Sequence, residues 1–224
     1  NGSIAAKLTN NHLWNIITVN TCDILIRNNH IENIPGTLDN GISLYSLENE
    51  FLSTQVSVSN NTIIGFSGNE NSQGVSGSGI LLAGGKDVTL TKNDIIANGK
   101  GIYVSEDCKT VFNQQCTGNI SDLFIENNSI EIGQTAIMLM HNVSNVKISS
   151  NNFSNNGQGV WLRKAFSNLI TKNRITDHYY GIRIDSNSSQ NLIFDNYFSE
   201  NNIHARDPDS VNYWNVTQKV GENI

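Results

Sequence analysis

The chain has few prolines, few charges and few cysteines, and it has no long apolar run. Only two of its 224 residues are proline, charged residues make up 15%, and the net charge is −6. This composition excludes a nucleic-acid-binding surface and a disordered polyelectrolyte. No segment approaches the roughly 18 consecutive apolar residues of a membrane-spanning helix, so we expect no membrane span. No charged-then-apolar signal peptide opens the chain, which begins with Asn1, so we expect a segment cut from a longer protein.

The three cysteines make an odd number. Cys108 and Cys116 bracket the segment CKTVFNQQC, and a bridge closing so short a loop would stabilise the fold by about 2.6 kcal/mol. We therefore predict a disulfide between them and an oxidising location: extracellular, cell-surface or periplasmic. Cys22 is left over, and we expect a small buried apolar residue there rather than a reactive thiol.

Asparagine, in contrast, is abundant, with 36 residues in the chain. It forms turns well and helices poorly. Several asparagines open the same pattern: Asn, any residue, Ile or Phe, then Ala or Gly eight places after the Asn, and an apolar-x-apolar triplet. The marker asparagines are Asn11, Asn29, Asn61, Asn93, Asn128, Asn151, Asn173 and Asn196. From Asn29 on they are spaced by 32, 32, 35, 23, 22 and 23 residues, so the chain is an internal repeat with a basic period of 22 to 23.

Each period contains three short segments with strand-like alternation and none with helical periodicity. Identical segments 22 residues apart stack in register, which predicts an all-β, single-stranded, right-handed parallel β-helix. We expect one domain over residues 1–224, with about eight coils and inserted loops in the early ones, at 65–79 and 105–121 among others. The marker asparagines should stack at a turn and hydrogen-bond along the axis of the helix.

This repeat resembles the right-handed β-helices of the pectate-lyase-like superfamily. The closing segment NYWNVTQKVGENI, residues 212–224, further resembles archaeal and bacterial surface or periplasmic proteins, including the copper-accessory β-helix proteins of nitrous oxide reductase maturation. The resemblance covers nearly the whole chain and concerns the fold. It implies an extracytoplasmic protein and identifies no reaction.

In such a fold, function must come from outward side chains and inserted loops. The outward side of the third strand combines large apolar groups with charged ones. Its candidate ligand-binding residues are Tyr103, Met138, Met140, Trp161, Arg163, Arg183 and Asp185. An exposed patch of this kind is typical of a contact surface, here for an acidic polysaccharide or a cell-surface protein. The alternative is that a loop or a neighbouring domain covers it.

A polysaccharide-active enzyme (lyase, epimerase or hydrolase) is the main competing interpretation. The resembling lyases use acidic clusters that hold calcium, and the resembling hydrolases use grouped aspartates. Asp185 stands alone in its column and Asp94 lies on another strand, so no catalytic residue is assigned. Residues that could take part in acid–base chemistry are Arg163, Arg183, Asp185, His141 and His178.

No cofactor is expected, although calcium remains an option by resemblance. Copper is a lesser alternative, because Met138, Met140 and His141 combine thioethers with an imidazole, a set that suits Cu(I). Two methionines at strand spacing are more often packing residues.

Eight glycosylation sequons occur, beginning at Asn1, Asn60, Asn119, Asn127, Asn142, Asn152, Asn187 and Asn215. About six are expected by chance in so asparagine-rich a chain, so the number alone does not indicate a glycoprotein. A β-helix also exposes unpaired strand edges at its ends. Because we find no amphipathic helix to cap them, we expect a longer chain or end-to-end or side-by-side self-association.

Overall fold

The structure, a computed structural model, describes residues 6–19, 22–34, 40–46, 54–66, 77–96, 99–106, 120–185, 187–208 and 211–215. All regular elements in these ranges are β-strands, and every strand pair is parallel. Within the same ranges there is no helix long and apolar enough to cross a membrane. The all-β prediction is therefore confirmed.

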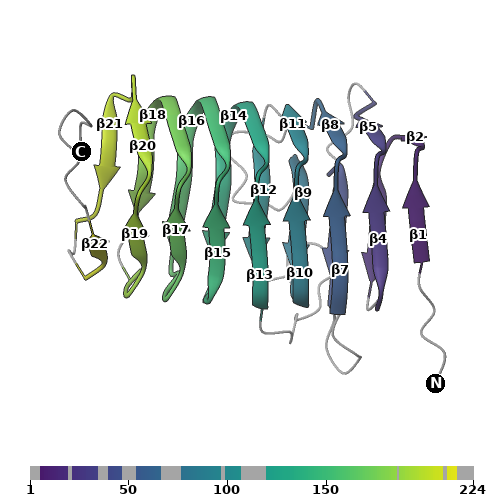
Figure 1. Ribbon diagram of the computed structural model, residues 1–224, viewed down its shortest axis with the longest axis horizontal. Helices are drawn as coiled ribbons and strands as arrows, with labels where there is room; N and C mark the ends of the chain where they lie inside the picture. Colours follow the sequence, from purple (N-terminus) through teal and green to yellow (C-terminus); the bar gives the residue numbers. More distant parts are fainter. Residues whose placement is uncertain are drawn as a thin grey trace.

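The first sheet collects the strand that precedes each marker asparagine (Figure 1). Its nine strands are β1 (Ala6–Thr9), β4 (Ile24–Arg27), β7 (Thr54–Ser59), β10 (Lys86–Thr91), β13 (Ser121–Glu126), β15 (Val146–Ser149), β17 (Leu169–Thr171), β19 (Leu192–Phe194) and β22 (Tyr213–Asn215). Strands that lie side by side here are one repeat apart in the sequence, as stacking in register requires.

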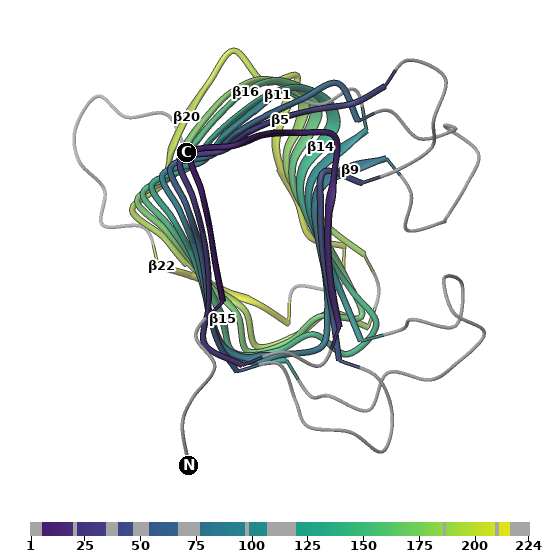
Figure 2. The ribbon, with the colours of Figure 1, turned by 90° about the vertical axis from the view of Figure 1, so that its right-hand side faces the viewer.

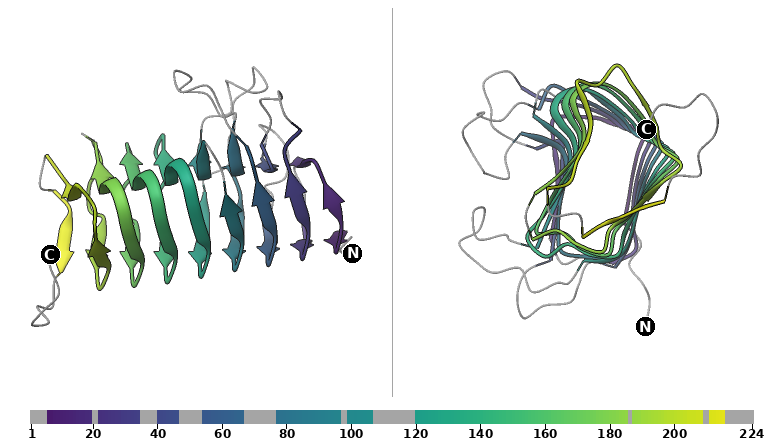
Figure 3. Two further views of the ribbon diagram at one scale, coloured as in Figure 1. Left: turned by 90° about the horizontal axis from the view of Figure 1, so that it is seen from above. Right: turned by 90° about the vertical axis from the view of Figure 1, so that its left-hand side faces the viewer.

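The second sheet contains the other two strands of every coil. The early and terminal coils have short strands: β2 (His12–Leu13), β3 (Ile16–Val19), β5 (His30–Glu32), β6 (Ile42–Tyr45), β8 (Thr62–Ile64), β9 (Ser78–Ala83), β11 (Asp94–Ile96), β12 (Lys100–Ser105), β20 (Tyr197–Ser199) and β21 (Ile203–Arg206). Three later coils fuse both segments into one strand: β14 (Ser129–Met140), β16 (Asn152–Arg163) and β18 (Arg174–Ile184). Figure 3 shows these as continuous curved ribbons in the green part of the chain. The coils without an insertion are those in which the strand continues around the corner.

The coils wind in the predicted right-handed sense. Seen from the N-terminal end, the chain runs along the first sheet, across the top and down the opposite side, clockwise and away from the viewer (Figure 2). The interior is filled by apolar side chains such as Ile63, Ile95, Ile130 and Phe153, which are fully or almost fully buried. One continuous cluster of this kind runs through the coils, which confirms the predicted parallel β-helix.

The marker asparagines form the predicted column. The Oδ1 of Asn151 accepts hydrogen bonds from the backbone N–H and the side-chain amide of Asn128, at 2.9 and 3.0 Å. Its own amide donates to the carbonyl of Ile125 and to the Oδ1 of Asn173, both at 2.9 Å. The same pattern runs from Asn11 to Asn196. Each asparagine thus joins two coils and satisfies buried backbone groups at the turn.

The residue before each column asparagine has a left-handed backbone, which explains the repeated Asn-Asn pairs. These residues are Asn10, Asn28, Asn60, Lys92, Asn127, Ser150, Lys172 and Asp195, with φ between 52° and 60°. Asparagine adopts this conformation more readily than most residues. The abundance of asparagine therefore has two local causes, the hydrogen-bonded column and the turn before it.

Two further columns were not expected from the sequence. One begins each strand of the first sheet in the last coils: Asn168, Asn191 and Asn212 are joined Oδ1 to amide, at 2.9 and 2.8 Å. The other lies at the corner of the fused strands and contains Asn156, His178 and Asn201. Each turn of the later coils therefore has its own stack of polar side chains.

His178 takes the place of an asparagine in this corner column, and the protein should become acid-sensitive because of it. Its Nδ1 lies 3.1 Å from the backbone nitrogen of Asn156 and accepts that N–H. Burial lowers the pKa of His178. The unfolded chain, with a histidine pKa of about 6.5, therefore binds a proton more readily than the folded one. Stability should fall as the pH drops below that value.

We expect His178→Asn, which restores the residue type of Asn156 and Asn201, to remove much of this acid dependence. Urea midpoints at pH 7.5 and pH 5 measure it. His204→Asn is the matched control and should keep the wild-type loss. An equal loss in wild type and His178→Asn would show that His178 is not the responsible group.

The predictions on cysteine have mixed outcomes. Cys108 and Cys116 lie outside the described residues, so their disulfide stays a prediction, as does most of the two loops at 65–79 and 105–121. The expectation for Cys22 is wrong, because this residue is exposed. It lies at an isolated bridge to Thr54 between the first and second coil segments, where the strand has not yet entered the core.

Candidate functional site

The outward column of the third strand lies where the sequence predicts it. The strand register places Leu81, Tyr103, Met138, Trp161 and Arg183 beside one another in successive coils. The early part of this column forms an apolar cluster separate from the helix interior, made of Tyr45, Leu81, Ala83, Tyr103, Met138 and Met140, with Trp161 packed against it. These side chains therefore point away from the core, as expected.

The expectation that this column is an exposed patch is wrong for Tyr103, Met138 and Met140. Their exposed fractions are 1%, 4% and 2%, so the alternative of a covered patch holds for these three residues. Burial also raises the pKa of Tyr45 in the same cluster. Strand alternation shows which side of the sheet a residue occupies, but it does not show what covers that side.

Further along the column, Trp161, Arg183 and Asp185 are half-buried and form one unit. The indole N–H of Trp161 donates to Oδ2 of Asp185 at 2.9 Å, and Nε of Arg183 donates to Oδ1 at 2.9 Å. The guanidinium of Arg183 lies over the Trp161 ring, 4.5 Å from its centroid. Both carboxylate oxygens of Asp185 are thus engaged, and one face of the indole is covered by a cation.

A second aromatic–cation group adjoins this unit. Tyr180 lies within 5.8 Å of the Arg183 guanidinium and 6.0 Å of that of Arg206, measured to its ring centroid. Arg206 also donates to the Tyr180 hydroxyl at 3.5 Å. Together these side chains border a depression lined by Arg163, Lys164, Arg183, Asp185, Asn187, Arg206 and Pro208.

The depression is strongly cationic in a chain whose net charge is −6. Four of its lining residues carry a positive charge and one carries a negative charge. Among the described residues, the only ion pair in the depression joins Arg183 to Asp185, which leaves Arg163, Lys164 and Arg206 without a carboxylate. This arrangement favours an anionic ligand, since guanidinium groups bind carboxylates and sulfates through paired hydrogen bonds.

The residues considered for acid–base chemistry do not converge. His141 lies 3.0 Å from the Ser105 hydroxyl through Nδ1, whereas His178 is buried in the corner column. Asp94 belongs to β11, on a different side of the coil. In the described part of the depression, Asp185 is the single carboxylate. The geometry there suits binding better than proton transfer between paired groups.

Residues 116–224 match a family model described as "Periplasmic copper-binding protein (NosD)". The match includes the closing segment, and it confirms the predicted resemblance to copper-accessory β-helix proteins. The expected extracellular, cell-surface or periplasmic location is likewise confirmed by this match to a periplasmic family. No curated protein sequence matches the chain.

Solved structures with similar backbones share little sequence with this chain. The A-module of Azotobacter vinelandii mannuronan C-5 epimerase AlgE6 is 12% identical with a TM-score of 0.47, covering 93% of this chain and 72% of that one. The enzymatically active domain of bacteriophage CBA120 tailspike protein 2 is 11% identical with a TM-score of 0.37, covering 94% and 38%. The fold assignment rests on the strand pairing of the chain itself.

Proposed function

We propose that this extracytoplasmic β-helix module binds an acidic polysaccharide in the cationic depression of its last coils. The observation that carries the proposal is the excess of cations there: Arg163, Lys164 and Arg206 surround an Arg183–Asp185 pair that is already satisfied. The repeating coil adds a geometric argument, because a surface built from stacked coils suits an extended ligand with repeating negative charges.

In this proposal the aromatic rings position the cations rather than stack on sugars. Arg183 covers one face of Trp161, and Tyr180 lies between Arg183 and Arg206. Tyr103, Met138 and Met140 support the strand from a buried position. Of the seven predicted ligand-binding residues, Arg163 and Arg183 therefore contact the ligand, and Trp161 and Asp185 hold Arg183 in place.

The test is equilibrium binding of polyuronate, sulfated and neutral polysaccharides to wild type and to the double variant Arg163→Gln with Arg206→Gln. Loss of two charge-assisted hydrogen bonds should weaken binding of the acidic chains by about 100-fold. Raised salt should weaken it in wild type. Arg174→Gln is the matched control, because Arg174 forms a similar cation–π pair with Tyr197, at 5.1 Å, on another part of the coil.

Each outcome of this test separates the competing functions. Equal binding of acidic and neutral chains, or an unchanged affinity in the double variant, would contradict the proposal. New chain ends or altered uronate units in the mixture would favour the polysaccharide-active enzyme. No binding to any polysaccharide would favour a cell-surface protein as the partner.

Copper binding is the second candidate, since the matched family is described as copper-binding. The sequence points to Met138, Met140 and His141 for this role. Both methionines are buried in the apolar cluster, and His141 contacts Ser105. Their geometry is that of packing residues, so the cationic depression is the better supported site.

A further inference from the structure

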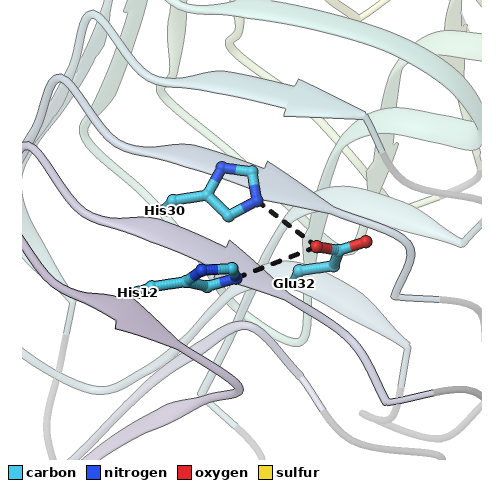
Figure 4. Close-up of side chains that lie close together, drawn as sticks. All are labelled: His12, His30 and Glu32. Carbon is cyan, nitrogen blue, oxygen red and sulfur yellow. Dashed lines mark hydrogen bonds and ion pairs between the residues drawn. The ribbon is translucent and has the colours of Figure 1, made fainter.

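At the opposite end of the β-helix, two histidines and a glutamate lie together. The Nε2 of His30 is 3.4 Å from Oε2 of Glu32, and the Nε2 of His12 is 3.9 Å from the same oxygen. One ligand atom from each of the three residues lies within 4.8 Å of the others. Figure 4 shows both imidazoles turned toward the carboxylate.

The register of the first two coils produces this cluster. β2 pairs with β5 so that His12 stands directly beside His30, at the spacing of neighbouring strands. Glu32 lies two residues after His30 on the same face of its strand. Three potential ligands therefore come from two adjacent coils, on a backbone that fixes their relative positions.

The side chains retain the freedom that a bound ion needs. Their exposed fractions are 68% for His12, 41% for His30 and 54% for Glu32. Ligand atoms around a tetrahedral zinc ion lie about 3.3 Å apart, given metal–ligand bonds of about 2.0 Å. Small rotations of exposed rings would close the present distances to that value. Trp14, Asn33 and Ile34 border the same surface hollow and leave room for solvent ligands.

We propose that His12, His30 and Glu32 form a site for one divalent transition-metal ion of the Zn²⁺ and Cu²⁺ class. Two imidazoles and a carboxylate suit these ions, whereas Ca²⁺ and Mg²⁺ prefer sets made only of oxygen. The bound ion joins the first coil to the second at the exposed end of the β-helix. This site lies outside residues 116–224, the segment that matches the copper-binding family.

The experiment is calorimetric titration of the 224-residue chain, prepared without a polyhistidine tag, with Zn²⁺. We expect one ion per chain. The dissociation constant should rise at least about tenfold in His30→Asn and in Glu32→Gln, because loss of even an outer-shell partner has that effect. Asp94→Asn is the matched control: Asp94 is an exposed carboxylate two rungs further along the column of His12 and His30, and its loss should leave the affinity unchanged.

A second readout places the ion. Bound Cu²⁺ should quench the fluorescence of Trp14, which borders the same hollow, and the quenching should disappear in Trp14→Phe. Absence of saturable Zn²⁺ uptake would overturn the proposal. So would uptake that keeps the wild-type affinity in His30→Asn, because the ion would then bind elsewhere, for example at cysteine.

Discussion

Replacing Asn151 by alanine is expected to lower the free energy of unfolding by about 4 kcal/mol, because each buried polar group left without a partner costs about 1–3 kcal/mol. Two such groups would remain: the backbone N–H of Asn128 and the carbonyl of Ile125, which bond to the Asn151 side chain at 2.9 Å each. The link to Asn173 would be lost as well.

Urea unfolding measures this effect, and Asn152→Ala is its matched control. Asn152 is the exposed neighbour of Asn151 on the same turn, so its replacement should change stability by no more than about 0.5 kcal/mol. Equal midpoints for the two variants, with equal slopes, would contradict the claim that the asparagine column holds the coils together.

Gly159→Ala should destabilise the fold by about 3 kcal/mol, at the upper end of what overpacking a core usually costs. A methyl group at Gly159 would lie 2.5 Å from the carbonyl oxygen of Gly181 and 2.8 Å from Cγ2 of Ile175. The first contact is with the backbone of the next coil, which cannot move without disturbing the strand pairing. The position recurs eight residues after each marker asparagine, and it is this approach of neighbouring coils that requires a small residue there.

Ala136→Gly provides the comparison, because Ala136 occupies the equivalent position one coil earlier. Its methyl is not needed for packing between coils, and we expect a loss of no more than about 1 kcal/mol from the added chain entropy. Thermal or urea unfolding of both variants measures the difference. A Gly159→Ala protein that unfolds at the wild-type midpoint would show that the coils can move apart at this corner.

The fold could be predicted because the repeat makes each local signal appear many times. The marker Asn, the small residue eight places later and the apolar triplets all recur at one spacing, so stacking was the only arrangement that satisfied them together. The column of Asn168, Asn191 and Asn212 gives a weaker signal, three asparagines spaced by 23 and 21 residues before apolar pairs. It was missed because those asparagines do not open the main pattern.

The site was only partly predictable. Alternation along the third strand correctly placed Trp161, Arg183 and Asp185 on one face, but the burial of Tyr103 and Met138 depends on what lies over that face. The contribution of Lys164 and Arg206 was missed, since it comes from the folding of the coil ends around the depression.

The histidine cluster left a signal in the sequence, the related segments NNHL and NNHI in the first two coils. The first coil has only 18 residues between Asn11 and Asn29, so its repeat was less apparent than that of the later coils. Aligning the two marker asparagines would have placed His12 beside His30.

The most direct measurement of the central claim is a two-dimensional ¹H–¹⁵N spectrum of the three indole N–H groups during titration with a short polyuronate. Trp161 donates its indole N–H to Asp185 beside the cationic depression, whereas Trp14 lies at the far end of the β-helix. We predict a saturable shift of the Trp161 signal and none for Trp14, with no response to a neutral oligosaccharide. An unmoved Trp161 signal at saturating polyuronate, or a shift confined to Trp14, would contradict the proposed binding site.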